Sequence, residues 1–196
     1  MAIDEGLQVV CTDLQASGGV RNILLRSWTA GDDVAYVNSA AAHSISSIKK
    51  SGPANADWFI YEFTNETAAL TVNATKENGS TVFECGLSFT IPNMTAGRFH
   101  ELQNLLSECM MGIVVDSNGT PFVIGASEKY ENESVQERSQ TYLNVASMEG
   151  VTGAAYNDDN GVTVSLMAKQ YELPRVYTGT LTLYTGALGT QEATTD

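Results

Sequence analysis

The chain has 196 residues and a mass of 21.0 kDa, enough for one sizeable domain with a hydrophobic core. Its 10 Lys and Arg against 23 Asp and Glu give a net charge of −13, which argues against a protein that wraps duplex DNA by neutralising phosphates. No apolar run approaches about 20 residues, so we expect no bilayer-spanning helix and no membrane insertion.

Two apolar runs open the chain, at Leu7–Cys11 and Val20–Trp28, and the Gly18-Gly19 turn between them predicts a strand pair. Residues from about 30 to 56 differ, because they hold few large apolar side chains and show no sustained period of 2 or 3.6. This pattern predicts a long loop. Loops of that length inside a compact domain are usually functional or disordered.

An aromatic run follows the expected loop. Its alternation predicts a strand with Phe59, Tyr61 and Phe63 on the core side. Three Asn-Gly pairs, Asn78-Gly79, Asn118-Gly119 and Asn160-Gly161, then lie between or just before β-rich runs. Such pairs favour type I′ hairpin turns, in which both central residues need positive φ. Three of them in one chain predict a mainly antiparallel protein.

A single helix is expected at about residues 95–109, where apolar side chains recur on one face and Pro92 and Thr95 lie just upstream. The recurring side chains are Phe99, Leu102, Leu105, Leu106 and Cys109. This face predicts that the helix docks onto a sheet.

The last third of the chain predicts a polar surface loop at about 127–139 and two strand stretches, at about 141–150 and 161–184, the second broken near Pro174. The predicted fold is therefore mainly β: an antiparallel β-sandwich or barrel with one packed helix and the long loop at about 30–56. We expect one β-rich domain over residues 1–187 and a flexible C-terminal tail over 188–196.

Few residues suggest a catalytic or ligand-binding site. The two candidate imidazole bases, His43 and His100, have no Gly-x-Ser-x-Gly nucleophile motif to serve, and no phosphate-binding loop occurs. The run Asn157–Gly161 resembles part of a calcium loop, but Tyr156 stands where the first carboxylate belongs and no Glu falls at the twelfth position. We expect no catalytic, cofactor-binding or metal-binding residues, no cofactor and no enzymatic activity.

The cysteines are odd in number and widely spaced, at Cys11, Cys85 and Cys109. This spacing predicts free core thiols in a reducing cell and no disulfide framework. The acidic start, Met1 to Glu5, is unlike the basic start of a secretory signal.

The order of elements is an opening strand pair from Gly6 to Trp28, the long loop, a strand pair joined at Asn78-Gly79, one helix at Thr95 to Cys109, a hairpin from Gly112 to Gly119 and a last hairpin from Ala155 to Leu166. This order resembles that of small virion proteins of tailed phages, most of all the tail tube, or major tail, proteins. The resemblance extends over most of the chain, in the order of elements more than in any one motif.

The resemblance implies a subunit without catalysis that assembles into stacked, commonly hexameric rings. Inner sheets of the subunits join into a β-lined channel, and the long early loop reaches the next ring. Its partners would be further copies of itself and other virion tail proteins, and it would be made in the host cytoplasm and reside in the virion tail. DNA would pass through without specific binding, which an acidic channel favours because it repels phosphates.

Two other functions fit the same composition. The first is another virion role, that of a capsid-decorating or head–tail joining protein, which would bind a capsid or portal and form no long tubes. The second is a β-sandwich carbohydrate-binding module that uses Trp28, Trp58 and nearby tyrosines. This module would be a monomer with a ligand cleft.

Overall fold

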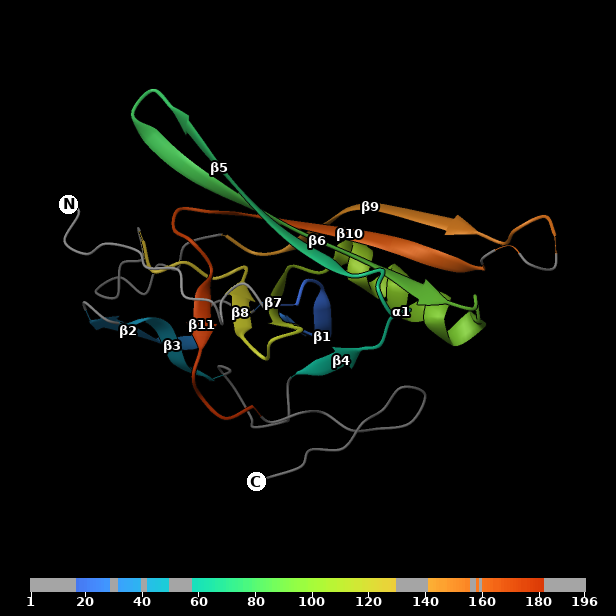
Figure 1. Ribbon diagram of the computed structural model, residues 1–196, viewed down its shortest axis with the longest axis horizontal. Helices are drawn as coiled ribbons and strands as arrows, with labels where there is room; N and C mark the ends of the chain where they lie inside the picture. The colour runs from blue at the N-terminus through green and yellow to red at the C-terminus, as the bar shows by residue number, and fades with distance from the viewer. Residues whose placement is uncertain are drawn as a thin grey trace.

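The computed structural model describes residues 17–28, 32–39, 42–49, 58–129, 141–155, 158 and 160–181. Within these ranges the chain forms eleven strands and one helix in two sheets, one above the other (Figure 1). The predicted mainly-β, sandwich-like fold with one helix is confirmed. The described strands form two open sheets and no closed barrel.

The larger sheet has seven strands in the order β2-β3-β11-β8-β7-β1-β4. Every neighbouring pair is antiparallel except β11 and β3, which are parallel. The strands are β1 (Val20–Ser27), β2 (Asp33–Ser39), β3 (Ala42–Lys49), β4 (Phe59–Tyr61), β7 (Met110–Asp116), β8 (Pro121–Ile124) and β11 (Arg175–Tyr177).

The smaller sheet has four strands in the order β5-β6-β10-β9, all antiparallel. The strands are β5 (Ala69–Glu77), β6 (Ser80–Pro92), β9 (Asn144–Val151) and β10 (Gly161–Gln170). β6 and β10 are the longest strands in the described ranges, and they stay paired from Gly161 with Pro92 to Gln170 with Phe83.

The main core lies between the two sheets. β10 supplies every second residue to it, which is the alternation expected of a strand with one buried face. The buried side chains of this layer include Ile23 and Leu25 of β1, Leu87 and Phe89 of β6, Val114 of β7, and Val162, Val164 and Leu166 of β10. Each such side chain stabilises the fold by about 1.5–3 kcal/mol relative to leaving it exposed.

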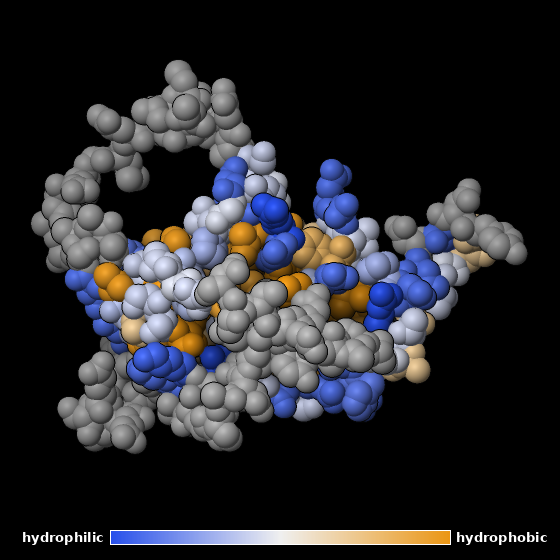
Figure 2. Space-filling model, turned by 90° about the horizontal axis from the view of Figure 1, so that it is seen from below, coloured by the Kyte–Doolittle hydropathy of each residue, from blue (hydrophilic) through white to orange (hydrophobic). Residues whose placement is uncertain are grey.

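A second apolar cluster lies on the other face of the seven-stranded sheet, around Leu24, Ile45, Trp58, Ile113 and Val123. The central strands of this sheet are therefore buried on both faces, which is why β1 and β7 have consecutive apolar residues instead of an alternating pattern. Figure 2 views the molecule from this side, where hydrophobic side chains show between hydrophilic ones.

The helix α1 (Ala96–Ser107) confirms the prediction at about 95–109. Thr95 is its N-cap, because the threonine Oγ1 accepts a hydrogen bond from the Arg98 backbone N–H at 3.4 Å. Leu102 and Leu105 are buried in the core between the sheets. Cys109, which the periodicity places on the helix, follows it at the approach to β7.

The prediction of a long loop at about 30–56 is wrong where the structure describes the chain, because β2 and β3 form an antiparallel hairpin there. A register shift between Ala35 and Tyr36 interrupts the alternation, so that no period of 2 is visible in the sequence. Val34, Ile45 and Ile48 nevertheless pack into the second cluster. Pairing of β3 with β11 and burial of these side chains hold the segment in the larger sheet.

The three Asn-Gly pairs have three different geometries. Asn78 and Gly79 both have positive φ, at 48° and 84°, and join β5 to β6 as predicted. In the β7–β8 connection only Gly119 has positive φ, because the Asp116 carboxylate accepts N–H groups from Asn118 and Thr120 and shapes the turn. The prediction of a turn at Asn160-Gly161 is wrong, since Gly161 already belongs to β10.

Several predictions fall on residues that the structure does not describe. They are the opening strand at Leu7–Cys11, most of the loop at 127–139, the end of the stretch at 161–184 and the tail at 188–196.

Gly125 offers a test of the close packing between the end of β8 and the backbone of Met110 and Leu143. Its φ is +85°, and a Cβ there would lie 2.9 Å from the carbonyl oxygen of Met110 and 3.1 Å from the backbone nitrogen of Leu143. We expect Gly125→Ala to lower the free energy of unfolding by about 3 kcal/mol, from backbone strain and displacement of two chain segments. Urea denaturation measures it. In the matched Gly119→Ala variant φ is +89° but no atom lies within 4 Å of the added Cβ, so only about 1–2 kcal/mol should be lost. Equal losses in the two variants would contradict the steric account.

Candidate interaction surface

The outer face of the four-stranded sheet is a regular surface of the described chain. Because β5, β6, β10 and β9 are paired in register, their outward residues line up in rows across the sheet. These residues are mostly small and bear hydroxyl groups: Thr71 and Thr75 on β5, Ser88 and Thr90 on β6, Thr163 and Ser165 on β10, and Ser147 on β9. Strand register thus brings seven hydroxyl-bearing side chains onto one face.

Contacts on this face are local and leave it weakly charged. The hydroxyls of Thr90 and Thr163 are hydrogen-bonded at 3.0 Å across β6 and β10. Lys169 Nζ lies 3.1 Å from Glu84 Oε1 in an exposed ion pair. Together with Glu149, these two side chains give one positive and two negative charges, so the described side chains of the face sum to −1. Most of the net charge of −13 therefore lies elsewhere in the chain.

The four-stranded sheet has two free edges. β5 pairs only with β6, and β9 pairs only with β10, among the strands that the structure describes. An edge strand exposes unpaired backbone N–H and C=O groups that can pair with another chain. Neither edge is short, since β5 has 9 residues and β9 has 8.

The β5–β6 hairpin projects from the body of the molecule (Figure 1). β10 ends at Gln170, which pairs with Phe83, so the part of β6 from Ser80 to Val82 is paired with β5 alone. Residues 71–76 of β5 are all exposed, and of these Thr75 and Lys76 lie on the two-stranded part, one on each of its faces. A two-stranded ribbon exposed on both faces gains little from packing within its own chain.

An open groove of about 290 Å³ lies between α1 and the edge strand β4. Leu25, Met110 and Leu105 line its apolar part, and Phe59 of β4 is 41 % exposed beside it. Glu101 and Glu108 of the helix add two carboxylates. A hydrogen bond between Tyr61 of β4 and Glu101 of α1 connects the two walls of the groove.

The hydroxyl of Tyr61 donates this hydrogen bond to Glu101 Oε1 at 2.6 Å, which joins β4 to α1. Burial, and then the Glu101 carboxylate, raise the pKa of the tyrosine, so it remains a neutral donor at physiological pH.

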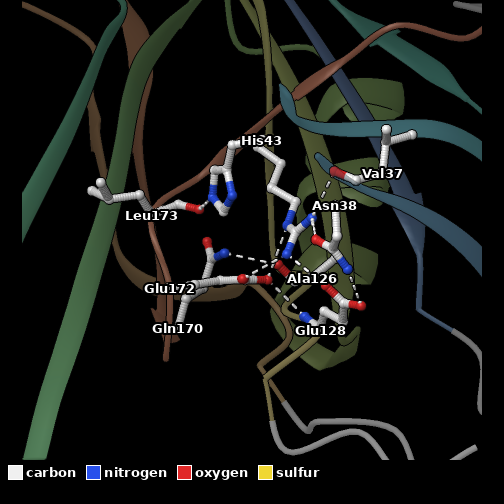
Figure 3. A network of polar contacts seen from close by, with 9 residues as sticks. Val37, Asn38, His43, Ala126, Glu128, Gln170, Glu172 and Leu173 are labelled. Atoms are coloured by element: carbon white, nitrogen blue, oxygen red, sulfur yellow. Dashed lines mark hydrogen bonds and ion pairs between the residues drawn. The ribbon is translucent and has the colours of Figure 1, made fainter. Parts of the chain in front are cut away.

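A polar network joins the two sheets at the far end of β10 (Figure 3). The guanidinium of Arg175 donates to Glu128 Oε2 at 2.6 Å, to Glu172 Oε2 at 2.9 Å and to Asn38 Oδ1 at 2.8 Å. Burial disfavours this charge, but the carboxylates of Glu172 and Glu128 outweigh burial, and the pKa of Arg175 is raised.

Beside this network, the buried Gln170 side chain connects β10 to the segment after β8. Its Nε2 donates to the Ala126 carbonyl at 2.8 Å, and its Oε1 accepts from the Gly125 N–H at 3.3 Å. Each donor in these contacts has an acceptor, and each carboxylate has a donor. The network is therefore a structural connection between the sheets.

A buried ion pair lies in the second apolar cluster. Arg26 and Asp32 are 3 % and 2 % exposed, and the guanidinium Nη2 lies 2.7 Å from Asp32 Oδ2. Arg26 also stacks over Trp58, with Cζ 5.5 Å from the ring centroid. Its Nε has no hydrogen-bond partner. Asp32 thus provides the carboxylate that compensates a buried positive charge.

The residues that the sequence singled out are not brought together into one site. His43 lies on β3, with Nε2 3.1 Å from the Leu173 carbonyl oxygen, and His100 is exposed on α1. Of the run Asn157–Gly161, the described Asp158 accepts the N–H groups of Ala154 and Ala155, both at 2.7 Å. These bonds lower the pKa of the Asp158 carboxyl group. The carboxylate therefore stabilises the turn to which it belongs. Within the described ranges no three His, Cys, Asp or Glu side chains are grouped as metal ligands.

The thiols differ in burial. Cys85 is fully buried in the core between the sheets, as predicted, whereas Cys109 is half-buried and Cys11 lies outside the described residues. The hydroxyl-rich face and the groove were not predicted, because both depend on strand register and on the position of α1. Alternation of apolar and polar residues in Phe83–Ile91 and in Val162–Leu166 was the signal for the face in the sequence.

Comparisons with protein-family models, with curated proteins and with solved structures give no match for this chain. The helix α1, the one helix of the described ranges, is too short and too polar to cross a bilayer.

The buried ion pair can be tested against the exposed one. We expect Asp32→Asn to lower the free energy of unfolding by about 3–5 kcal/mol, because the Arg26 charge stays buried without its counter-ion. Lys169→Met, which breaks the exposed pair with Glu84, should cost less than about 1 kcal/mol. Chemical denaturation of both variants beside wild type gives the comparison. A loss at Asp32 no larger than that at Lys169 would show that Arg26 is compensated in another way.

The thiols provide a second test. Burial raises the pKa of Cys85 to about 11, so at pH 8 its thiolate population is roughly a hundredfold below that of an ordinary cysteine. In a Cys11→Ala background we expect a disulfide reagent to label Cys109 first and Cys85 only after unfolding. Mass spectrometry of digested samples identifies the labelled thiol, and urea-unfolded protein is the control. Labelling of native Cys85 as fast as Cys109 would contradict the packing of β6.

Proposed function

We propose that this chain is a non-enzymatic structural subunit of a virion, the tail tube protein of a tailed phage. Copies would assemble into stacked, hexameric rings whose channel conducts DNA. The observation that carries this proposal is the four-stranded sheet, which has two long edges without a strand partner in the described ranges and a regular outer face of mostly small, hydroxyl-bearing side chains.

The edges support lateral assembly. β5 of one copy can pair with β9 of the next, so that the four-stranded sheets of neighbouring subunits continue into one another around a ring. Such pairing satisfies the backbone groups that each copy leaves exposed at its edges. The seven-stranded sheet, buried on both faces, would then be the scaffold on the outside of the ring.

The outer face suits a channel through which DNA moves. A wall that binds duplex DNA needs Lys or Arg to neutralise phosphates, and the described side chains of this face offer one lysine, already paired with Glu84. Hydroxyl groups and a slight negative charge would leave the DNA free to slide. DNA is therefore proposed to pass through without specific binding.

The experiment is assembly of the purified protein, followed by light scattering and negative-stain electron microscopy. We expect rings or tubes with a central hole, and a dependence on the β9 edge. Ser147→Lys/Val151→Lys places two charged side chains on that edge and should raise the concentration needed for assembly by roughly tenfold or more.

The matched control is Gln103→Lys/Leu106→Lys, which adds the same charge to exposed positions of α1 and should assemble like wild type. A protein that stays monomeric at all concentrations would overturn the proposal. In that case, binding to capsids would favour the decorating or joining role, and binding to immobilised glycans would favour the carbohydrate-binding module.

A further inference from the structure

We propose that the projecting part of the β5–β6 hairpin, residues 74–83, docks into the groove between α1 and β4 of a second copy of this chain. We call this part the arm. The inference rests on the proposed function, in that it names one contact through which copies assemble. It is separate from the edge pairing of β5 with β9, because it uses the tip of the arm and a groove lined by the other sheet.

The arm has the features of a segment that lacks a partner in its own chain. Beyond the pair of Phe83 with Gln170 it is a two-stranded ribbon, and its β5 residues Thr75 and Lys76 are exposed on opposite faces. Val72, which is 39 % exposed and lies just before the arm, shares one face with Ala74 and Lys76 because they are two residues apart on a strand. This face offers a short apolar strip that ends in a positive charge.

The groove offers the complement. Its apolar part is formed by side chains of the seven-stranded sheet and of α1, including Leu25 and the exposed Phe59, and two carboxylates, Glu101 and Glu108, lie on and at the end of the helix wall. An extended segment that carries apolar side chains and a positive charge can therefore meet apolar side chains and carboxylates there.

Charge selects the arm as the occupant. Lys169, Arg26 and Arg175 already have carboxylate partners within the chain, and Arg98 donates to the carbonyls of Pro92 and Asn93. Arg21, Lys49 and Lys76 have no ion-pair partner among the described residues, and of these three only Lys76 lies on the projecting hairpin, close to its Asn78-Gly79 turn. Between two copies that each have a net charge of −13, such a contact also offsets repulsion.

Geometry makes the contact intermolecular. The arm leaves one end of the four-stranded sheet, whereas α1 follows the other end of β6, and Figure 1 shows the two at opposite ends of the molecule. The arm cannot fill the groove of its own chain. A contact from one end of a copy to the other end of the next is heterologous, and such contacts generate rings or filaments.

Zero-length carbodiimide cross-linking of assembled protein tests the contact. We expect an amide between Lys76 and Glu108 or Glu101, and an equal mixture of isotope-labelled and unlabelled protein should show that it joins two copies. Lys169 and Glu84, 3.1 Å apart in one chain, form the internal positive control.

Charge exchange supplies the second readout. Lys76→Glu and Glu108→Lys should each raise the concentration needed for assembly by roughly tenfold, and the double variant should return it to within about threefold of wild type. Both positions are exposed, so folding should be unaffected, which circular dichroism and thermal unfolding check. Arg21→Glu makes the same charge change on exposed β1, outside arm and groove, and should assemble normally.

Three outcomes are distinguishable. An intermolecular Lys76 cross-link together with rescue by the double variant supports the contact. Normal assembly of Lys76→Glu, with the Lys169–Glu84 cross-link present and no Lys76 cross-link, overturns the arm contact and leaves the proposed function intact. A wild-type protein that never assembles overturns both.

Discussion

The apolar layer between the two sheets determines where every other feature of this chain can lie. β10 gives alternate side chains to that layer, so its remaining side chains must point outward, and the register with β6, β5 and β9 turns them into continuous rows. The same layer receives Leu102 and Leu105 of α1, which holds the helix beside β4 and thereby forms the groove. Core packing and the two candidate surfaces are thus consequences of one layer.

Polar contacts then fix the edges of this arrangement. Gln170 connects the end of β10 to the segment after β8, while Arg175 connects β11 to Glu128 and to Asn38 of β2. Buried polar groups of this kind destabilise the fold unless each has a hydrogen-bond partner, and that requirement restricts them to one geometry. The bond from Arg175 to Asn38 adds to the apolar packing that holds the β2–β3 hairpin, in a segment whose sequence shows no periodicity. The proposals for assembly rely on what these contacts leave unsatisfied, which is the strand edges and the arm.

The sequence predicted elements well where local rules act alone. The Asn78-Gly79 turn needs positive φ at two successive residues, and the helix needs its Thr95 cap and an apolar face, so both could be read locally. It failed where a register shift or a longer connection intervened. The shift at Ala35 and Tyr36 hid the β2–β3 hairpin, and Asn160 serves the start of the helix through the N–H groups of Asn93 and Met94 instead of forming a turn.

Composition and pattern by themselves determined the mainly-β class, the single helix, the weakly charged surface and the low number of residues with catalytic chemistry. They could not decide which strands stand at the edges, which hydroxyl groups share a face or where a groove opens. Those features depend on the pairing of segments far apart in the chain, such as β1 with β7 and β6 with β10. Long-range pairing is selected by the packing of whole sheets against one another, and no local stretch of sequence contains that information.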